Sequence, residues 1–494
     1  MGLNLTKISI LKMVKGMKNE IVKRIQEEFK ETVDLVIKPV KISFFQTIYV
    51  VYLESVTGSD KVNDYILKNV SFLSALPHKK LKDLQSLIPA PNTKVLKNPD
   101  EIEFYITNGF TIVLRGKEIL ALETRADIAR GIPEPTTEQV IFGPKDAFTE
   151  NIQINLGLLK RRLKSKNLKA KNRVIGRKSK TMVEVLYFDD IAEEDLVAHV
   201  LEELDKIDID GILDSGNIVE FLSKENKSHF PIIIKTERPD TAAKALLEGK
   251  VVLFIDTSPF ALILPGFFAD FINPVSDNYK KSNNINFLKI LRFFCFFFTI
   301  LAPAIYIALI NYNPETIPTS LLINFSTQRD NVPFPAIVEA LLMLLIYEIL
   351  RESDVRFPNS YGSAISILGA LILGEAAVNA GFVSPIMIIV IAFTFITSLI
   401  FTDQEIVNAA RHFRIIFLFA AAFYGLYGIV LAFFYFLIHV TELKTMGKPY
   451  FYPISPFDKI YLMKSLLKKN ISKDTKRSAM LTDKNFTKQR SDES

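Results

Sequence analysis

The chain has 494 residues, enough for several domains, and a formal net charge of +6. Its single cysteine, Cys295, excludes an internal disulfide and a cysteine metal cluster, and its five histidines show no HxH or HxxxH spacing. The sequence also lacks a phosphate-binding GxxxxGKS or GxxxxGKT loop and a strand-linked GxGxxG motif. We therefore expect no metal ion, no nucleotide and no other cofactor.

Hydrophobic residues are distributed unevenly along the chain. Charged residues recur every few positions up to about Asp256, whereas residues 287–440 are strongly apolar and the remainder is basic. This pattern predicts a soluble head, a membrane region and a basic tail. The expected divisions are a basic N-terminal segment (1–33), a first α/β subdomain (34–149), a basic helical connector (150–179), a second α/β subdomain (180–286), a transmembrane region (287–440) and a basic cytoplasmic tail with a disordered end (441–494).

The head contains one pattern twice. Residues 44–70, FFQTIYVVYLESVTGSDKVNDYILKNV, are typical of a strand, a turn and a helix, and residues 180–207 repeat that order. Residues 109–124 are typical of a β-hairpin, and residues 249–264 repeat it at a similar offset of about 135–140 residues. A nearly constant offset indicates duplication. The predicted fold class is an α/β soluble head of two related subdomains, followed by an all-α transmembrane bundle.

A strongly basic run lies between the two copies. Residues 160–180, KRRLKSKNLKAKNRVIGRKSK, include eleven Lys or Arg and no acid. Such a run can bind the phosphates of nucleic acid or of anionic lipid. Because no aromatic residues are interleaved for base stacking, we expect either a solvated helix end or contact with membrane lipid, and no nucleic-acid partner.

The apolar region contains four clear candidate spans, residues 287–310, 363–380, 385–401 and 413–439. No apolar signal-peptide core follows the first lysines, so the head is expected to stay in the cytoplasm. The tail from Glu442 onward has twelve Lys or Arg against six Asp or Glu, which favours the cytoplasm as well. Equal sidedness requires an even number of crossings. The shorter, charged segment near 336–351 is therefore expected to be re-entrant or interfacial.

That segment carries three acidic residues. The sequence PFPAIVEALLMLLIYEILRE, residues 333–352, contains Glu339, Glu348 and Glu352, and Arg351 is the only basic residue within it. A carboxylate in the hydrocarbon core costs several kcal/mol, so intramembrane carboxylates are usually paired or functional. A re-entrant or interfacial position would spare them from crossing the bilayer alone.

The next segment, YGSAISILGALILGEAAVNAGFVSP, combines two contrasting faces. Small residues on one face let neighbouring helices approach closely. In a ring of identical subunits the other face could line a pore, with aliphatic side chains as the gate and an acidic ring that favours cations. The alternative is a buried helix in a monomeric bundle, with Glu375 paired to a neighbour such as Arg411. The packing face comprises Ser363, Ala370, Gly374, Ala377 and Gly381, and the pore-lining face comprises Ile365, Leu368, Ile372, Glu375 and Asn379.

Several stretches carry a family resemblance, and none of them is a catalytic signature. They are IFGPKDAFTENIQINLGLLKRRLK (141–164), IDIDGILDSG (207–216), TERPDTAAKALLEGKVVLFID (236–256), PFPAIVEALLMLLIYEILRESDVRFP (333–358), LGALILGEAAVNAGFVSPIMIIV (368–390) and YPISPF (452–457). In their order and number they resemble the A subunit of the spore germinant receptors, the GerA family of endospore-forming bacteria. The likeness spans residues 34–464, nearly the whole chain.

The resemblance implies a multi-pass protein of the inner spore membrane, with its head and tail in the cytoplasm. It implies two partners, a permease-like B subunit that senses the nutrient and a lipoprotein C subunit. It also implies a homo-oligomeric ring, with a pentamer as the working expectation, that forms a ligand-gated ion channel and triggers germination. The family frequently has a glutamine where Glu375 stands, and the tail after Pro453 lacks the family's arginine-rich ending.

Three classes of function remain to be separated. A channel-forming signalling subunit follows from the resemblance. An ion-coupled membrane transporter is the alternative, because intramembrane carboxylates are common there, but transporters usually show inverted repeats within the membrane region. Here the duplication lies in the head, and four spans are few for a transporter. The sequence shows no combination of nucleophile, base and orienting residue, so an enzyme is not expected.

Overall fold

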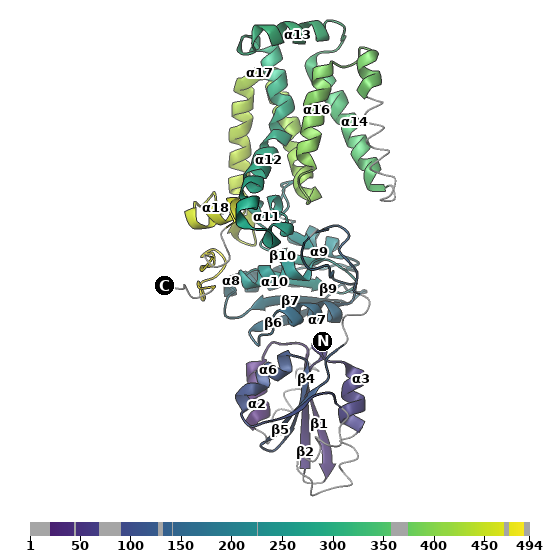
Figure 1. Ribbon diagram of the computed structural model, residues 1–494, viewed down its shortest axis with the longest axis vertical. Helices are drawn as coiled ribbons and strands as arrows, with labels where there is room; N and C mark the ends of the chain where they lie inside the picture. Colours follow the sequence, from purple (N-terminus) through teal and green to yellow (C-terminus); the bar gives the residue numbers. More distant parts are fainter. Residues whose placement is uncertain are drawn as a thin grey trace. The chain divides into compact units, whose positions relative to one another are not determined.

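The structure is a computed structural model that describes residues 20–43, 46–68, 90–126, 132–140, 142–224, 226–356, 374–468 and 474–488. The chain forms two compact units (Figure 1). The sheet unit comprises the described parts of residues 1–225, 235–265 and 475–494, and the helical unit comprises those of residues 226–234 and 266–474. The sheet unit is formed mainly by the part of the sequence that is rich in charged residues, and the helical unit mainly by the apolar part.

The sheet unit contains two five-stranded sheets with the same topology. The strand order is β1-β2-β4-β5-β3 in the first and β6-β7-β9-β10-β8 in the second. This repetition confirms the predicted head of two related α/β subdomains. The strands are β1 (Leu35–Ser43), β2 (Gln46–Leu53), β3 (Thr93–Leu96), β4 (Phe110–Arg115), β5 (Glu118–Glu123), β6 (Leu168–Ile175), β7 (Thr181–Phe188), β8 (Ile234–Thr236), β9 (Val251–Ile255) and β10 (Ala261–Leu264).

The helices of the sheet unit repeat as well. Each copy has one helix before its first strand, helical turns after its second strand and another helix before its fourth strand. The helices of the first copy are α2 (Glu20–Glu28), η1 (Glu54–Val56), α3 (Ser59–Val62), η2 (Asn63–Leu67), η3 (Pro99–Glu101) and α6 (Ile102–Thr107). Those of the second copy are α7 (Ile152–Arg162), α8 (Glu194–Asp205), α9 (Ser215–Leu222) and α10 (Pro239–Leu247).

The first sheet is covered on both faces because its central strands alternate apolar side chains to both sides. In β2, Val51 and Leu53 pack with α2 and α6, whereas Ile48 and Val50 pack on the opposite face with Val62 and the turn that follows it. Figure 1 shows α2 and α6 on one side of this sheet and α3 on the other. Burial of both faces explains why these strands are apolar at consecutive positions.

The structure revises the expected boundaries. Helix α2 lies in the supposed N-terminal segment 1–33, and its Val22 and Ile25 belong to the core of the first copy. Only the first part of the expected helical connector 150–179 is helical. Strand β6 begins at Leu168, because its main chain pairs with β7 along its whole length. The second subdomain therefore starts before residue 180.

The described part of the tail beyond residue 474 is docked on the second copy. Leu481 is fully buried, Arg477 Nε donates to Leu247 O at 2.7 Å, and Lys484 forms an ion pair with Glu194 at 2.6 Å. Gly249 has a φ of +97°, and a Cβ there would lie 2.6 Å from Leu481 O. The expected disordered end therefore does not include residues 474–488, and the remaining residues lie outside the described part of the chain.

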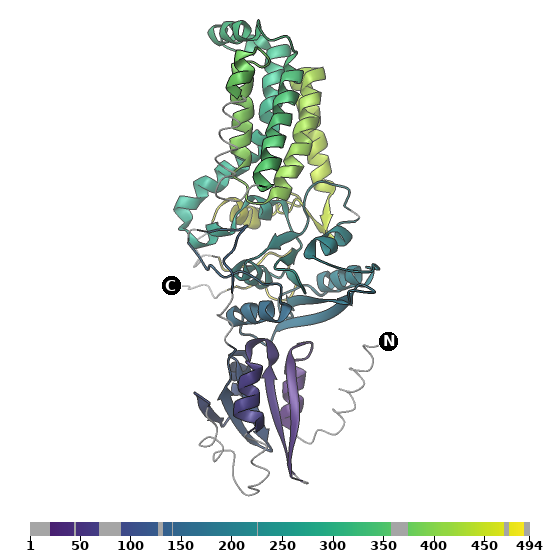
Figure 2. The same cartoon turned by 90° about the vertical axis from the view of Figure 1, so that its right-hand side faces the viewer.

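The helical unit consists of helices that lie side by side (Figure 2). Its elements are α11 (Phe268–Ile272), η4 (Val275–Tyr279), α12 (Ser282–Asn311), η5 (Pro314–Thr316), α13 (Thr319–Arg329), α14 (Ala336–Arg356), α16 (Pro385–Ser398), α17 (Gln404–Glu442), α18 (Lys459–Leu466) and the two-stranded β11 (Lys444–Thr445) and β12 (Lys448–Pro449). Residues 374–379 form a further short helical stretch. Helix α14, expected as a short segment near 336–351, is continuous over 21 residues.

Helix α17 reverses direction at Gly425, which has φ 59° and ψ −140°. The rings of Phe413 and Phe436 lie 5.2 Å apart. In a straight helix, 23 residues would separate them by about 35 Å. Tyr312 Oη donates to the carbonyls of Ala422 and Phe423 at 2.7 and 2.9 Å and thereby binds main-chain acceptors freed at the turn. The segment 413–439, expected as a single span, is therefore divided between two antiparallel helices, 404–424 and 426–442.

Gly425→Ala should destabilise this hairpin. The backbone at Gly425 is nearly exclusive to glycine, and a Cβ would lie 2.8 Å from the side chain of Tyr312. We expect a loss of about 1–3 kcal/mol from backbone strain and a further loss from the collision, seen as a lower midpoint of thermal unfolding in detergent. Gly447→Ala is the matched control, because Gly447 also has a positive φ but open space around its Cβ position. Equal midpoints for both variants would contradict the tight turn.

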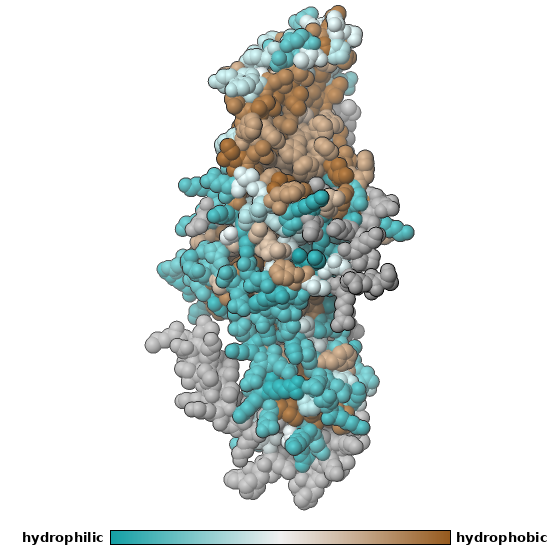
Figure 3. Space-filling view, turned by 90° about the vertical axis from the view of Figure 1, so that its left-hand side faces the viewer, coloured by the Kyte–Doolittle hydropathy of each residue, from teal (hydrophilic) through white to brown (hydrophobic). Residues whose placement is uncertain are grey.

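Much of the outer surface of the helical unit is hydrophobic (Figure 3). Among the described residues, the helix Ile285–Asn311 and the helical hairpin Gln404–Glu442 are each long and apolar enough to cross a membrane, and Pro385–Ser398 is a shorter apolar helix. Phe423, Tyr427 and Ile438 are each more than 60% exposed on α17. At the end of the unit formed by α13, Figure 3 shows a hydrophilic surface. An apolar belt of this kind is typical of a surface that faces lipid.

Candidate functional site: buried charges and an outward-facing carboxylate

The first carboxylate of α14 is fully buried and held by the start of α16. Glu339 is 0% exposed, and its Oε2 accepts hydrogen bonds from Ser384 N at 3.0 Å and from Ser384 Oγ at 2.9 Å. Arg329 Nε lies 3.6 Å from Glu339 Oε1, which accepts no hydrogen bond from the residues that the structure describes. The N-terminus of a helix and a nearby guanidinium both favour a negative charge. These contacts explain why an acidic residue is accommodated at position 339 in the interior of the helical unit.

The second carboxylate of α14 is shared by two guanidinium groups. Glu348 Oε2 lies 3.0 Å from Arg351 Nη2 and 2.9 Å from Arg411 Nη1. Arg351 also donates to Asn408 Oδ1 at 3.0 Å. The third acid, Glu352, lies on the exposed side of the helix. The three acids of α14 thus lie in different environments: Glu339 is buried, Glu348 is paired with arginines and Glu352 is exposed.

A buried arginine connects the other helices. Arg414 is 1% exposed, donates from Nε to Thr299 O at 2.8 Å and lies 5.8 Å from the centre of the Tyr347 ring. Tyr347 Oη and Ser398 Oγ are 3.1 Å apart. A carbonyl oxygen and an aromatic face both stabilise a guanidinium away from water. Arg414 therefore helps to fix the mutual position of α12, α14, α16 and α17.

The two expected faces of the segment after α14 lie partly outside the described residues, since Ser363, Ile365, Leu368, Ala370 and Ile372 fall there. The described residues differ strongly in exposure. Gly374 is buried beside Ile388 of α16, and Ala377 is half-buried against the apolar core of the helices. Glu375 and Asn379 are exposed. Gly381 ends this stretch with φ +68°, a conformation that favours glycine.

The structure changes the alternative considered for Glu375. Arg411, named as its expected partner in a monomeric bundle, is bound to Glu348 instead. Glu375 is exposed on the side of its helix away from the buried Gly374. An exposed carboxylate that follows an apolar stretch is the feature that most requires a functional explanation.

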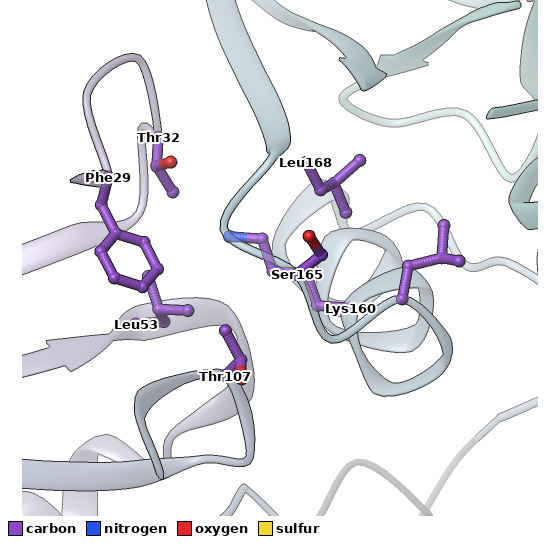
Figure 4. A pocket seen from close by; sticks show the side chains of 8 residues that line it. Phe29, Thr32, Leu53, Thr107, Lys160, Ser165 and Leu168 are labelled. Carbon is purple, nitrogen blue, oxygen red and sulfur yellow. The ribbon is translucent and has the colours of Figure 1, made fainter. Parts of the chain in front are cut away.

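A second group of buried charges lies in the sheet unit, between the two copies. Lys160 of α7 forms an ion pair with Asp34, which also accepts a hydrogen bond from Ser55 Oγ. Burial would raise the pKa of Asp34, but the Lys160 ammonium and the Ser55 hydroxyl bring it below its usual value. Figure 4 shows a small cavity here, with Phe29, Thr32, Leu53 and Thr107 on one side and Lys160, Ser165 and Leu168 on the other. Its volume of about 10 Å³ suits one water molecule.

Glu184 of β7 is the unusual member of this group. It is 0% exposed, and among the described residues neither of its carboxylate oxygens has a hydrogen-bond partner. Burial and the neighbouring carboxylates of Asp34 and Asp256 raise its pKa to about 8, against the opposing effect of Lys160. Glu184 is therefore expected to carry a proton at neutral pH.

The basic run 160–180 is largely neutralised within the sheet unit. Lys166 pairs with Glu103 at 3.2 Å and Lys171 with Glu31 at 3.2 Å, both acids of the first copy. Further along the run, Arg173, Arg177 and Lys178 pair with acids in 205–210. These pairs give the run a role in joining the two copies and leave fewer charges for phosphate groups.

Across the described parts of the chain, no group of three or more His, Cys, Asp or Glu side chains is placed to hold a metal ion. In the described part of the helical unit, paired and buried charges are combined with exposed carboxylates, among them Glu352 and Glu375. Such an arrangement can position helices and attract ions.

A family profile described as "Bacillus/Clostridium GerA spore germination protein" matches residues 23–480. The chain belongs to the GerA family. The match covers both copies of the sheet unit and the helices, and all of the clusters described above lie within the matched residues.

Individual relatives cover most of the chain. Spore germination protein KA of Bacillus subtilis (strain 168) is 35% identical over 446 residues, which are 88% of this chain and 82% of that protein. Spore germination protein GerLA of Bacillus cereus is 33% identical over 444 residues, 88% of this chain and 90% of that protein. The crystal structure of the N-terminal domain of the A subunit of the Bacillus megaterium spore germinant receptor GerK3 is 28% identical, with a TM-score of 0.40, and covers 50% of this chain and 94% of that chain.

In this GerA-family protein, the structure adds three residues to those predicted from the sequence, Arg414, Ser384 and Glu184. Arg414 had a visible signal, because it stands in the apolar stretch that follows Arg411. Ser384 had a weaker one, a serine just before Pro385 at an expected helix start. Glu184 had no such signal, because a single sequence does not show whether an acid in a strand is exposed or buried.

Proposed function

We propose that this protein is the A subunit of a nutrient-sensing spore germinant receptor, and that its copies assemble into a ring that conducts ions across the inner spore membrane. The observation that supports this proposal most is the exposure of Glu375 and Asn379 on one side of a helix whose other side carries the buried Gly374. A carboxylate that faces lipid is costly. A water-filled path enclosed by neighbouring copies removes that cost, and the carboxylate can then attract cations into the path.

In the proposed ring, the packing face with Gly374 and Ala377 stays against the copy's own helices. The face with Glu375 and Asn379 lines the pore, and repeated carboxylates favour cations over anions. Ile365, Leu368 and Ile372 are proposed to continue this face as an aliphatic gate that excludes water when closed. A permease-like B subunit and a lipoprotein C subunit complete the proposed receptor, and the protein itself carries out no chemical reaction.

The ring can be tested by disulfide cross-linking in membranes. With the only native cysteine changed (Cys295→Ser), Asn379→Cys should yield disulfide-linked dimers on mild oxidation, because its side chain would face the shared pore. Ala377→Cys, two residues away and half-buried against the same copy's helices, is the matched control and should stay monomeric. Cross-linking of Ala377→Cys without that of Asn379→Cys would overturn the assigned faces.

We also propose a revised membrane topology. Helices α14 and α16 are parallel, since Glu339 pairs with Ser384 near their starts, and Tyr347 in the middle of α14 lies beside Ser398 at the end of α16. We propose that the span expected at residues 363–380 returns the chain between them. With α12, α14, this return, α16 and the two halves of α17, six passes replace the expected four. Both numbers are even, so the proposed location of the head and the tail stays cytoplasmic.

Labelling from outside the membrane tests the topology. In the Cys295→Ser background, Ser320→Cys in α13 should react rapidly with an impermeant maleimide in intact protoplasts, because α13 would lie outside. Lys459→Cys in α18 should react only after permeabilisation. Both positions are exposed in the helical unit, so accessibility within the fold does not distinguish them. Equal labelling in intact cells would contradict the six-pass arrangement.

A further inference from the structure

A short segment between α9 and β8 belongs to the helical unit, although its flanking residues belong to the sheet unit. We call residues 226–234 the finger. Its Phe230 is 2% exposed, and the ring lies 5.4 Å from Phe413 and 6.1 Å from Phe436, one in each half of α17. The carbonyl of Ile232 accepts hydrogen bonds from Gly266 N and Thr445 Oγ1, both at 2.9 Å. The finger is thus anchored beside both halves of the hairpin.

Three of the five histidines of the chain gather at the finger. The rings of His229 in the finger and His412 in 404–424 are stacked, with centroids 3.9 Å apart and planes inclined by 16°. His439 in 426–442 places Nε2 2.8 Å from Ser228 Oγ. The finger and the two halves of α17 each contribute one imidazole. These residues are far apart in sequence and carry no metal-binding spacing.

We propose that His229, His412 and His439 form a proton-sensitive clasp, which holds the finger on the α17 hairpin at neutral pH and releases it in mild acid. Imidazoles gain their proton between about pH 5 and 8. Stacked neutral rings attract each other, whereas two imidazolium ions at this distance repel. The clasp is therefore stable only while at least one ring of the stack is neutral.

Several titratable and charged groups surround the clasp. His412 is faced by His229 and His439, and His439 is faced by His229 and by Glu442. Lys227 and Arg411 are sequence neighbours of the stacked pair and add positive charge, and Arg411 is bound to Glu348. Glu442 is one carboxylate against three imidazoles, so it cannot neutralise them all.

The finger is continuous in the chain with a strand of the second sheet. The finger ends at Ile234, which is the first residue of β8, a strand of the second sheet. Release of the finger would therefore change the restraint on β8 and, in the other direction, on the two halves of α17. This inference concerns the hold of the finger on α17, and it does not require that the helices conduct ions.

Hydrogen exchange of the full-length protein in nanodiscs tests the clasp. Peptides covering 226–234 are compared between the natural protein and His412→Gln at pH 7.5 and at pH 5.5, because the ratio of the two rates at one pH cancels the intrinsic pH dependence of exchange. At pH 7.5 we expect a ratio near one. At pH 5.5 we expect the natural protein to exchange at least about fivefold faster, since only its stack can carry two charges.

His229→Gln provides a second, exposed position that removes the same repulsion and should behave like His412→Gln. His199→Gln, in α8 of the sheet unit, is the matched control and should follow the natural protein at both pH values. A ratio that is the same at pH 7.5 and pH 5.5 for both clasp variants would overturn the proposal. So would an acid-induced increase that His199→Gln abolishes equally.

Discussion

Spores that carry Leu368→Ala should germinate without nutrient or lose ions during their formation. In the proposed ring, Leu368 contributes to the aliphatic gate, and trimming it weakens the closed state more than the open one. A loss of about 1.4 kcal/mol from the closed state would increase the open fraction about tenfold. Germination in buffer without nutrient, followed by loss of optical density, measures the effect.

Glu375→Gln is the companion variant and should act in the opposite direction. It removes the acidic ring but leaves the aliphatic seal in place, so spores should stay dormant and release cations more slowly after nutrient is added. Glu375 is exposed in the structure, so this substitution should not disturb folding. Dormant, fully nutrient-dependent Leu368→Ala spores, together with leaky Ala370 or Ala377 variants, would show that the two faces are exchanged.

The second large effect involves Glu184 and is expected as the pH rises from about 4.5 to about 8. The pKa of Glu184 is raised by burial from its ordinary 4.5 to about 8, so between these values the folded state holds a proton that the unfolded state has lost. The stability of the sheet unit is therefore complete below about pH 4.5 and falls as the pH rises towards 8. With about 1.4 kcal/mol for each unit of pKa, the loss is a few kcal/mol.

Glu184→Gln should remove this dependence, because an amide has the shape of the protonated acid and does not ionise. Calorimetric unfolding of the full-length protein between pH 5 and pH 9 should show a smaller fall for the variant than for the natural protein. Glu202→Gln is the matched control, since Glu202 lies on α8 with a side chain that is 66% exposed. Parallel pH profiles for the natural protein and Glu184→Gln would show that Glu184 is not a buried neutral acid.

The duplicated head could be predicted because its signal is local and repeated. Residues 110–115 and 118–123 form one hairpin and residues 251–255 and 261–264 the other, as the alternating and continuous apolar stretches indicated. The basic run could not be interpreted in the same way. Lys160 and Lys171 bind Asp34 and Glu31, acids more than a hundred residues away, and no local pattern encodes such pairing.

The helical region shows where one sequence is ambiguous. Gly425 lies in an apolar stretch whose composition is that of a lipid-facing helix. Hydropathy alone therefore does not distinguish one long helix from two short antiparallel ones. The same limit applies to Glu348 and Arg411, 63 residues apart in the chain and 2.9 Å apart in the fold. The gathering of His229, His412 and His439 likewise follows from the hairpin and the finger.

The most direct test of the proposed channel is an ion-flux measurement on the reconstituted receptor. Liposomes containing the A, B and C subunits are loaded with potassium and a fluorescent indicator, and nutrient is added outside. We predict rapid cation release that depends on nutrient, becomes independent of nutrient with Leu368→Ala and slows with Glu375→Gln. Two results would contradict a pore formed by this protein. One is that the natural receptor and both variants release no cations, with or without nutrient. The other is that cations are released but neither substitution changes the rate.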